Sequence, residues 1–193
     1  LPQGTYDVAV SATDLAGNVG TDATADELVV AWTTVTWDGD GGDGRWLNAA
    51  NWSSDTVPQP GEAVEIAASA QDGPVVIDGN VKGVVVTSAR SIELRSGTVS
   101  DVHFTVAGGA ALRGLGGTLA DVSLDGTLDM ATDSAEMNVY GTLTLENQAT
   151  ILLGNRYGTV QSGLAFVGTS AIDGIGSIVF GGGTRDTAFI TAV

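Results

Sequence analysis

Cysteine is absent from this chain of 193 residues, and basic side chains are scarce. Without cysteine there can be no disulfide, no thiolate metal ligand and no thiol nucleophile. The 7 basic residues face 23 acidic ones, and the formal net charge is −16. Such a charge repels phosphate groups, which excludes nucleic acids and anionic membrane surfaces as favoured partners and leaves cations as better ones. Acidic surfaces also keep extracellular proteins soluble.

Aromatic residues and long apolar runs are few as well. Aromatic side chains make up 6% of the residues, whereas glycine occurs 28 times. A core of Val, Leu, Ile and Ala with tight turns favours short strands over helices. No apolar run approaches the roughly 20 residues of a membrane span, so we expect no membrane insertion. No signal peptide is recognised at Leu1, and we expect a mature fragment or an excised piece of a longer protein.

Residues 1–35 are expected to form a pair of strands. Tyr6, Val8 and Val10 alternate with polar or small residues, which is the pattern of a half-buried strand. A turn is expected over 14–18, and a second apolar run covers 28–32. A two-stranded ribbon is marginally stable by itself. It must pack on the rest of the chain, complete a neighbouring subunit by strand addition, or belong to a divided domain, and the sequence leaves all three open.

A different pattern extends over residues 64–193. Short runs alternate between apolar and polar residues, and Gly-Thr or Gly-Ser pairs separate the runs. No window shows the 3.6-residue period of a useful helix. The pattern predicts an all-β solenoid of about six or seven stacked rungs, each about 20 residues long.

Residues 36–63 separate these two regions. Trp37, Trp46 and Trp52 lie there among glycines and aspartates, and Asn48 and Asn51 are expected to turn the chain. The end of a solenoid exposes unpaired backbone groups and has to be covered. We therefore expect this segment to cap the first rung. No similar segment occurs near the C-terminus, so the array is expected to continue or to stack on a neighbouring copy.

Two parts of the sequence are similar to bacterial surface proteins. The stretch GTYDVAVSATDLAGN resembles the closing strands of the immunoglobulin-like domains repeated in giant bacterial surface proteins. The matching positions are Gly4, Tyr6, Val8, Val10, Ala12, Asp14, Ala16, Gly17 and Asn18. The segment TWDGDGGDGRWLNAANWSSDTVPQPGEAVEI, with the strands after it, resembles large secreted adhesins of the autotransporter or haemagglutinin type. This resemblance implies a right-handed parallel β-helix, an extracellular or cell-surface location, and partners that are neighbouring domains or other copies.

Two clusters are candidate calcium sites. Asp38, Asp40 and Asp43 are interleaved with glycines, and oxygen ligands on a flexible loop suit Ca²⁺. Their spacing departs from that of an EF-hand loop, and a glycine–aspartate turn is the alternative. Asp14 and Asn18 form the second cluster. There the resemblance to immunoglobulin-like repeats implies interdomain calcium, whereas the residue types alone favour a hydrogen-bonded turn.

The tryptophans have a second interpretation. Exposed aromatic faces stack on sugar rings, so Trp37, Trp46 and Trp52 could form a platform for a cell-surface glycan. A cap requires the same side chains to be buried, and we favour the cap.

Catalysis is not expected. The alternation places three aspartates on the outer faces of their strands: Asp121, Asp125 and Asp129. In water all three would stay ionised, whereas a glycosidase needs one carboxyl group of its pair to be protonated. His103 is the single histidine, and no G-x-S-x-G motif accompanies it.

The leading hypothesis is a non-enzymatic structural module of a bacterial extracellular protein. It would act as an adhesin stalk or as a self-assembling fibre or surface-layer subunit. The alternative is a β-helix that binds carbohydrate or degrades polysaccharide. A third hypothesis is a secretion module that folds only when it binds calcium outside the cell.

Overall fold

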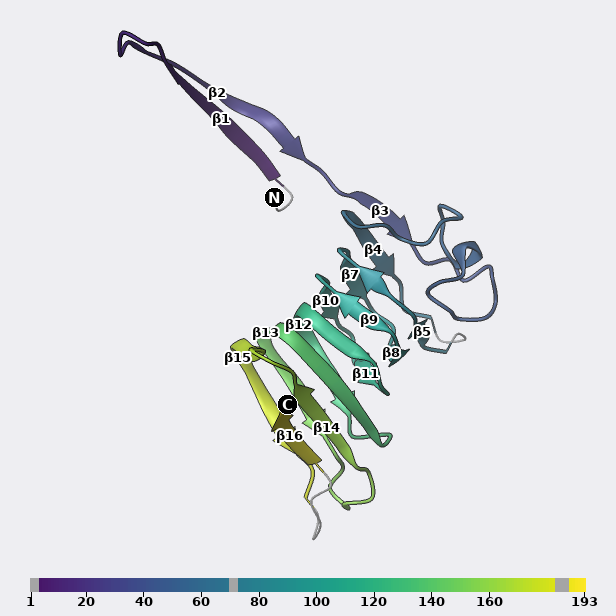
Figure 1. The fold of residues 1–193 in the computed structure, drawn as a ribbon. Helices are drawn as coiled ribbons and strands as arrows, with labels where there is room; N and C mark the ends of the chain where they lie inside the picture. Colours follow the sequence, from purple (N-terminus) through teal and green to yellow (C-terminus); the bar gives the residue numbers. More distant parts are fainter. Residues whose placement is uncertain (1–3, 70–72, 183–187) are drawn as a thin grey trace. The chain divides into compact units, whose positions relative to one another are not determined.

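The computed structural model describes residues 4–69, 73–182 and 188–193 (Figure 1). The chain divides into two compact units, Leu1–Thr33 and Thr34–Val193. The first three residues of the expected strand pair lie outside the described part, as do residues 70–72 and 183–187 within the expected solenoid.

The first unit is an antiparallel hairpin. β1 (Gly4–Thr13) pairs with β2 (Val19–Val30) across a tight turn. In that turn the Asp14 carboxylate accepts hydrogen bonds from the backbone N–H and the side-chain Nδ2 of Asn18, both 2.9 Å. The predicted strand pair is present, although its second strand begins directly after the turn, earlier than expected. Val10 is 59% exposed, because two strands alone enclose no core.

The second unit is a curled parallel sheet that forms a half-barrel (Figure 1). Among the described residues its main path contains eight strands. In spatial order these are β16 (Ala188–Ala192), β14 (Ser162–Phe166), β13 (Ala135–Leu153), β12 (Thr118–Met130), β10 (His103–Val106), β7 (Val85–Ser88), β4 (Glu62–Ile66) and β3 (Thr33–Thr36). The strands that pair beside this path are β5 (Val75–Asp78), β6 (Val81–Lys82), β8 (Ile92–Ser96), β9 (Thr98–Ser100), β11 (Leu112–Gly114) and β15 (Ala171–Phe180).

The chain returns to the same place in the sheet after about 20 residues. His103 of β10 lies beside Ser123 of β12, and Ser123 lies beside Thr144 of β13. A second parallel series runs through β5, β8, β11 and the ends of β12, β13 and β15. A third runs through β6, β9, the starts of β12 and β13, then β14 and β16. The prediction of an all-β, partly solenoid-like fold is thereby confirmed.

The long strand β12 bends where its register shifts. The two shifts fall at Asp121 and Gly126, whose φ angles are 53° and 131°. A Cβ atom on Gly126 would lie 2.5 Å from the backbone oxygen of Val106, so only glycine fits at this corner. At the other corner the Asp121 carboxylate accepts a hydrogen bond of 2.9 Å from the N–H of Thr142 on β13. The corners therefore tie successive rungs together.

The buried core consists of the side chains that the alternation predicts to point inward. The inward residues of β12 are at most 1% exposed, and they are Leu119, Val122, Leu124, Leu128 and Met130. Residues at the same register on the next strand are equally buried, as Ile151 is beside Leu128. The one helix in the described ranges is the three-residue 3₁₀ turn η1 (Ala49–Asn51), so no helix there is long enough to cross a membrane.

Candidate functional site: the tryptophan-rich cap

The cap segment, residues 36–63, is hydrogen-bonded to the first strands of the sheet. The N–H of Trp37 donates to the carbonyl of Glu65 on β4 (2.9 Å). Trp46 donates to the carbonyl of Val76 on β5, and Val76 donates back to that of Gly44, both at 2.8 Å. These bonds satisfy backbone groups that the first strands would otherwise present as an open edge.

The three tryptophan rings pack edge to face in one cluster. Trp46 and Trp52 are 0% exposed, and their ring centroids lie 4.7 Å apart in an edge-on arrangement. The ring of half-buried Trp37 lies 4.9 Å from that of Trp52. The indole N–H of Trp52 donates to the carbonyl of Trp46 (2.7 Å), whereas the buried indole nitrogen of Trp46 has no hydrogen-bond partner within the described residues. Trp46 and Trp52 have no exposed face on which a sugar ring could stack.

Asn51 is the buried polar centre of the cap. Its side chain is 0% exposed, and its Nδ2 donates to Oδ1 of Asp43 (2.7 Å) and to the carbonyl of Arg45 (2.9 Å). Its own carbonyl accepts hydrogen bonds from the N–H groups of Asp38 (3.1 Å) and Gly39 (3.2 Å). One asparagine thus joins both ends of the glycine–aspartate loop.

Asn48 holds the same loop from the other side. Its Oδ1 accepts from the N–H of Ala50 (3.1 Å), which caps η1, and its Nδ2 donates to Oδ2 of Asp43 (3.0 Å). Gly41 lies directly over both asparagines. A Cβ atom there would lie 2.5 Å from Nδ2 of Asn48 and 2.6 Å from Oδ1 of Asn51, so the loop requires glycine at this position.

The exposed carboxylate of Asp43 accepts hydrogen bonds from three donors, two on Oδ1 and one on Oδ2. The backbone N–H of Arg45 (3.0 Å) is the first cause that lowers the pKa of Asp43 below its ordinary value of 3.8, and the hydrogen bond from Asn51 is the second. The carboxyl group stays ionised at neutral pH. Both of its oxygen atoms point at amide groups of the chain.

The predicted calcium clusters have other partners in this structure. Asp38 accepts from the N–H of Asp40 (3.2 Å), and Asp43 is held by amides. The hydrogen bonds from Asn18 lower the pKa of Asp14, as in a hydrogen-bonded turn. Within the described residues no three His, Cys, Asp or Glu side chains are grouped to hold a metal ion. Calcium binding stays a prediction, which a melting curve with and without chelator would test.

A buried carboxylate on β8 was not singled out from the sequence. Glu93 alternates with apolar residues as an outward side chain should, yet it is 5% exposed. Arg113 of β11 donates to its Oε1 (2.6 Å), Arg95 donates to its Oε2 (2.7 Å), and Arg113 also reaches Asp133 (3.0 Å). The guanidinium groups cover the carboxylate. The signal that could have found this network is its spacing, because residues 93, 113 and 133 follow one another at intervals of 20 residues.

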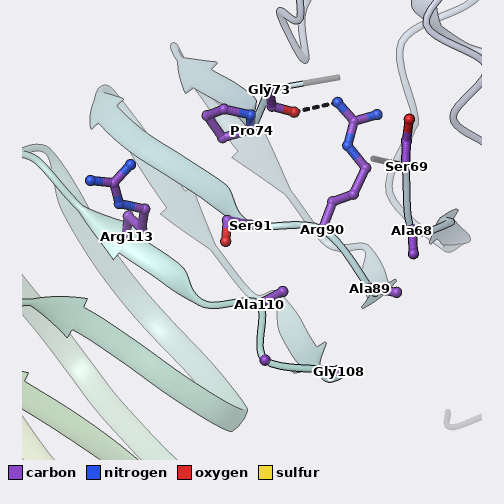
Figure 2. A pocket seen from close by; sticks show the side chains of 11 residues that line it. Ala68, Ser69, Gly73, Pro74, Ala89, Arg90, Ser91, Gly108, Ala110 and Arg113 are labelled. Atoms are coloured by element: carbon purple, nitrogen blue, oxygen red, sulfur yellow. Dashed lines mark hydrogen bonds between the residues drawn. The ribbon is translucent and has the colours of Figure 1, made fainter. Parts of the chain in front are cut away.

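A cavity of about 380 Å³ lies beside Arg90 (Figure 2). The guanidinium of Arg90 donates to the carbonyl of Gly73 and lies 5.8 Å from the centre of the Trp37 ring. Arg113, also on the wall of the cavity, is paired with Glu93. Both guanidinium groups therefore have protein partners, and Arg90 links the second rung to the cap.

The residues considered for catalysis interact either with nearby residues of their own chain segment or with the strand β13. Asp125 accepts from Nδ2 of Asn147 (2.8 Å), and Asp129 accepts from the N–H of Ala131 (2.8 Å). Nε2 of His103 lies 3.3 Å from Oγ1 of Thr105, and its Nδ1 lies 3.7 Å from a carboxylate oxygen of Glu146. These groups lie on the outer side of the sheet, where Asp129 is bonded within its own turn and Asp125 is bonded to β13.

Comparison with models of known protein families, with curated proteins and with solved structures found no match. Function is therefore inferred from the geometry alone.

Proposed function

We propose that this chain is a non-enzymatic structural module: a right-handed parallel β-helix, closed at its first rung by the cap segment, that serves as a stalk in a bacterial extracellular protein. Its partners are neighbouring domains of the parent protein or other copies. The parallel pairing at intervals of about 20 residues supports the helical winding. Crossovers between parallel strands of one sheet are right-handed in nearly all proteins, which supports a right-handed winding of the proposed β-helix.

The observation that carries the proposal is the way the cap ends the sheet. Backbone hydrogen bonds join it to β4 and β5, and Trp46 and Trp52 belong to the same apolar core as Val64 and Val75. Residues 51–53 in turn bind the end of β3 and the residues after it, since the N–H of Ser53 donates to the carbonyl of Thr36 (2.9 Å). A lid that covers part of the end strand hinders strand addition at this end.

Polar groups on the outside of the sheet support the same function. Asp121 binds the N–H of Thr142, and Asn80 accepts from the N–H of Thr98 (2.9 Å). Glu93 is bound by Arg113 of the following rung. Each bond joins one rung to the next and so stiffens the stack along its length, as a stalk requires.

Alanine variants of the cap tryptophans test this proposal. Trp52→Ala removes a fully buried ring and should destabilise the fold by about 3–5 kcal/mol, whereas half-buried Trp37→Ala should cost less. Thermal melting followed by circular dichroism measures both, and a glycan array measures binding. A Trp52→Ala variant that melts like the parent chain but loses binding to a polysaccharide would replace the structural proposal with the carbohydrate-binding one.

A further inference from the structure

A second cavity lies where the glycine–aspartate loop of the cap meets Arg90. Its volume is about 350 Å³, within the range of about 300–1,000 Å³ that small-molecule sites occupy. Gly73, Pro74 and Arg90 form a wall that it shares with the cavity in Figure 2, because all three line both. The cavity is therefore built jointly by the cap segment and the first rungs of the sheet.

Glycine backbone forms much of the cavity wall. The glycines that line it are Gly39, Gly42, Gly44 and Gly73. A Cβ atom on Gly42 would meet no atom of the described residues within 4 Å, so this glycine opens onto unfilled space. A Cβ atom on Gly39 would lie 3.1 Å from Nε1 of Trp37, so a side chain there would crowd the indole N–H. The glycines thus leave room for a ligand beside Trp37.

Trp37 is the cap tryptophan that a ligand can reach. Its ring is half-buried and lines the cavity, whereas Trp46 and Trp52 are 0% exposed. Nε1 of Trp37 makes no hydrogen bond within the part of the chain that the structure describes. An indole that is partly exposed can pack against C–H groups and donate its N–H to a hydroxyl oxygen.

Two charged side chains of opposite sign line the same cavity. The ionised carboxylate of Asp43 accepts one hydrogen bond on Oδ2, from Asn48 (3.0 Å), and a carboxylate oxygen can accept a second. The guanidinium of Arg90 lies 5.8 Å from the centre of the Trp37 ring. This pair of charges favours a ligand without net charge, and the net charge of −16 on the chain disfavours an anion.

We propose that this cavity binds one ring of a neutral sugar. A pyranose combines an apolar C–H face, which packs on Trp37, with hydroxyl groups that donate to Oδ2 of Asp43 and accept from Nε1 of Trp37. The site goes beyond the proposed function, and neither depends on the other, because a stalk needs no ligand. For a ligand as small as one sugar ring, the expected dissociation constant is on the order of 1 mM.

Heteronuclear NMR of the indole N–H groups tests the site in the parent chain. The probes are the methyl pyranosides of glucose, galactose and mannose, with galacturonate and glucosamine as charged counterparts. We expect at least one neutral sugar to shift the indole signal of Trp37 saturably, while the signals of Trp46 and Trp52 stay in place. The inference is overturned if none of the neutral sugars shifts that signal, or if a charged counterpart binds more tightly than all of them.

Gly42→Asn tests the location without removing a packed side chain. Asparagine tolerates the φ of 69° at this position, and its side chain narrows the cavity, so the dissociation constant should rise about tenfold or more at an unchanged melting temperature. The matched control is Gly17→Asn in the hairpin turn, where φ is 87° and a Cβ atom also meets nothing within 4 Å.

Trp37→Phe, which removes the indole N–H, should weaken binding as well, whereas Trp32→Phe at the half-buried tryptophan outside the cap should not. Sugar binding that is equally strong in Gly42→Asn and in the parent chain would place the sugar elsewhere and overturn the inference. A chain that binds none of the sugars but keeps a stable cap overturns this inference alone, because the alanine variants of the cap tryptophans test the proposed function by melting.

Discussion

Replacing Asn51 with alanine should loosen the cap while the rest of the sheet stays folded. The Nδ2 of this fully buried side chain donates one hydrogen bond to the ionised Asp43 carboxylate, which contributes about 1.5–3 kcal/mol net, and one to the carbonyl of Arg45, which contributes about 0.5–1.5 kcal/mol net. The Oδ1 atom has no hydrogen-bond partner within the described residues, so its removal returns part of that stability. We expect a net loss of about 2 kcal/mol, which is a decrease in melting temperature of about 4–8 °C for a chain of this size.

Two optical signals separate the cap from the sheet. Three of the four tryptophans lie in the cap segment, so intrinsic fluorescence reports the cap, whereas far-ultraviolet circular dichroism reports the strands. Stacked rungs unfold as nearest-neighbour units. In a urea titration the fluorescence midpoint of Asn51→Ala should therefore fall below its circular dichroism midpoint.

The matched control is Asn138→Ala. Asn138 is exposed on β13, and its side chain makes no hydrogen bond within the described ranges, so this variant should unfold like the parent chain. The reasoning is refuted if Asn51→Ala unfolds with both midpoints at the parent values, or if the two variants lose equal stability.

Three further substitutions test the rungs and the loop. Gly97→Ala should abolish folding or lower the free energy of unfolding by more than about 3 kcal/mol, because its Cβ would overlap the backbone of the preceding rung. Gly108 is also at positive φ but has open space around it, so Gly108→Ala should lower the free energy of unfolding by about 1 kcal/mol. Equal melting temperatures of the two variants would contradict this. Glu93→Gln should lower stability by about 2 kcal/mol in chemical unfolding, and Lys82→Gln, which breaks an exposed ion pair, should have little effect. The lowered pKa of Asp43 means that its stabilising effect is complete above its unfolded value of 3.8 and is lost as pH falls through the lower folded value. Cap fluorescence should therefore change below pH 3.8, and Asp43→Asn should remove that acid transition; a transition unchanged in the variant would assign it to another group.

The alternation of residues was sufficient to predict the buried faces of the strands but not their lengths, because the Gly-Thr pairs at 126–127 and 141–142, which were expected to separate short strands, lie inside β12 and β13. Leu124 and Leu128 are buried as expected, because a strand with one face in the core repeats every two residues. The interval of about 20 residues predicted the stacking in the same way. The hand of winding leaves no trace in such a pattern, since the same side chains point inward in either sense.

Partners that come from another rung were harder to predict. Glu93 reads as a solvated residue until the register places Arg113 beside it. Asp43 was predicted either as a calcium ligand or as part of a glycine–aspartate turn, and its hydrogen bonds with Asn48 and Asn51 could not be foreseen from the spacing. The burial of the tryptophans could be predicted, because the apolar end of the core has to be covered. The hydrogen bonds that hold them could not, because these depend on the backbone geometry of the cap segment.

Hydrogen exchange at the cap junction tests the capped stack most directly. The amide of Val76 on β5 donates to Gly44 in the cap, and the amide of Ser123 on β12 donates to Val102 deep in the stack. In the parent chain both amides should exchange slowly, and in Asn51→Ala the Val76 amide alone should lose protection. If the Val76 amide of the parent chain exchanges as fast as an exposed loop while Ser123 stays protected, the segment does not cap the sheet.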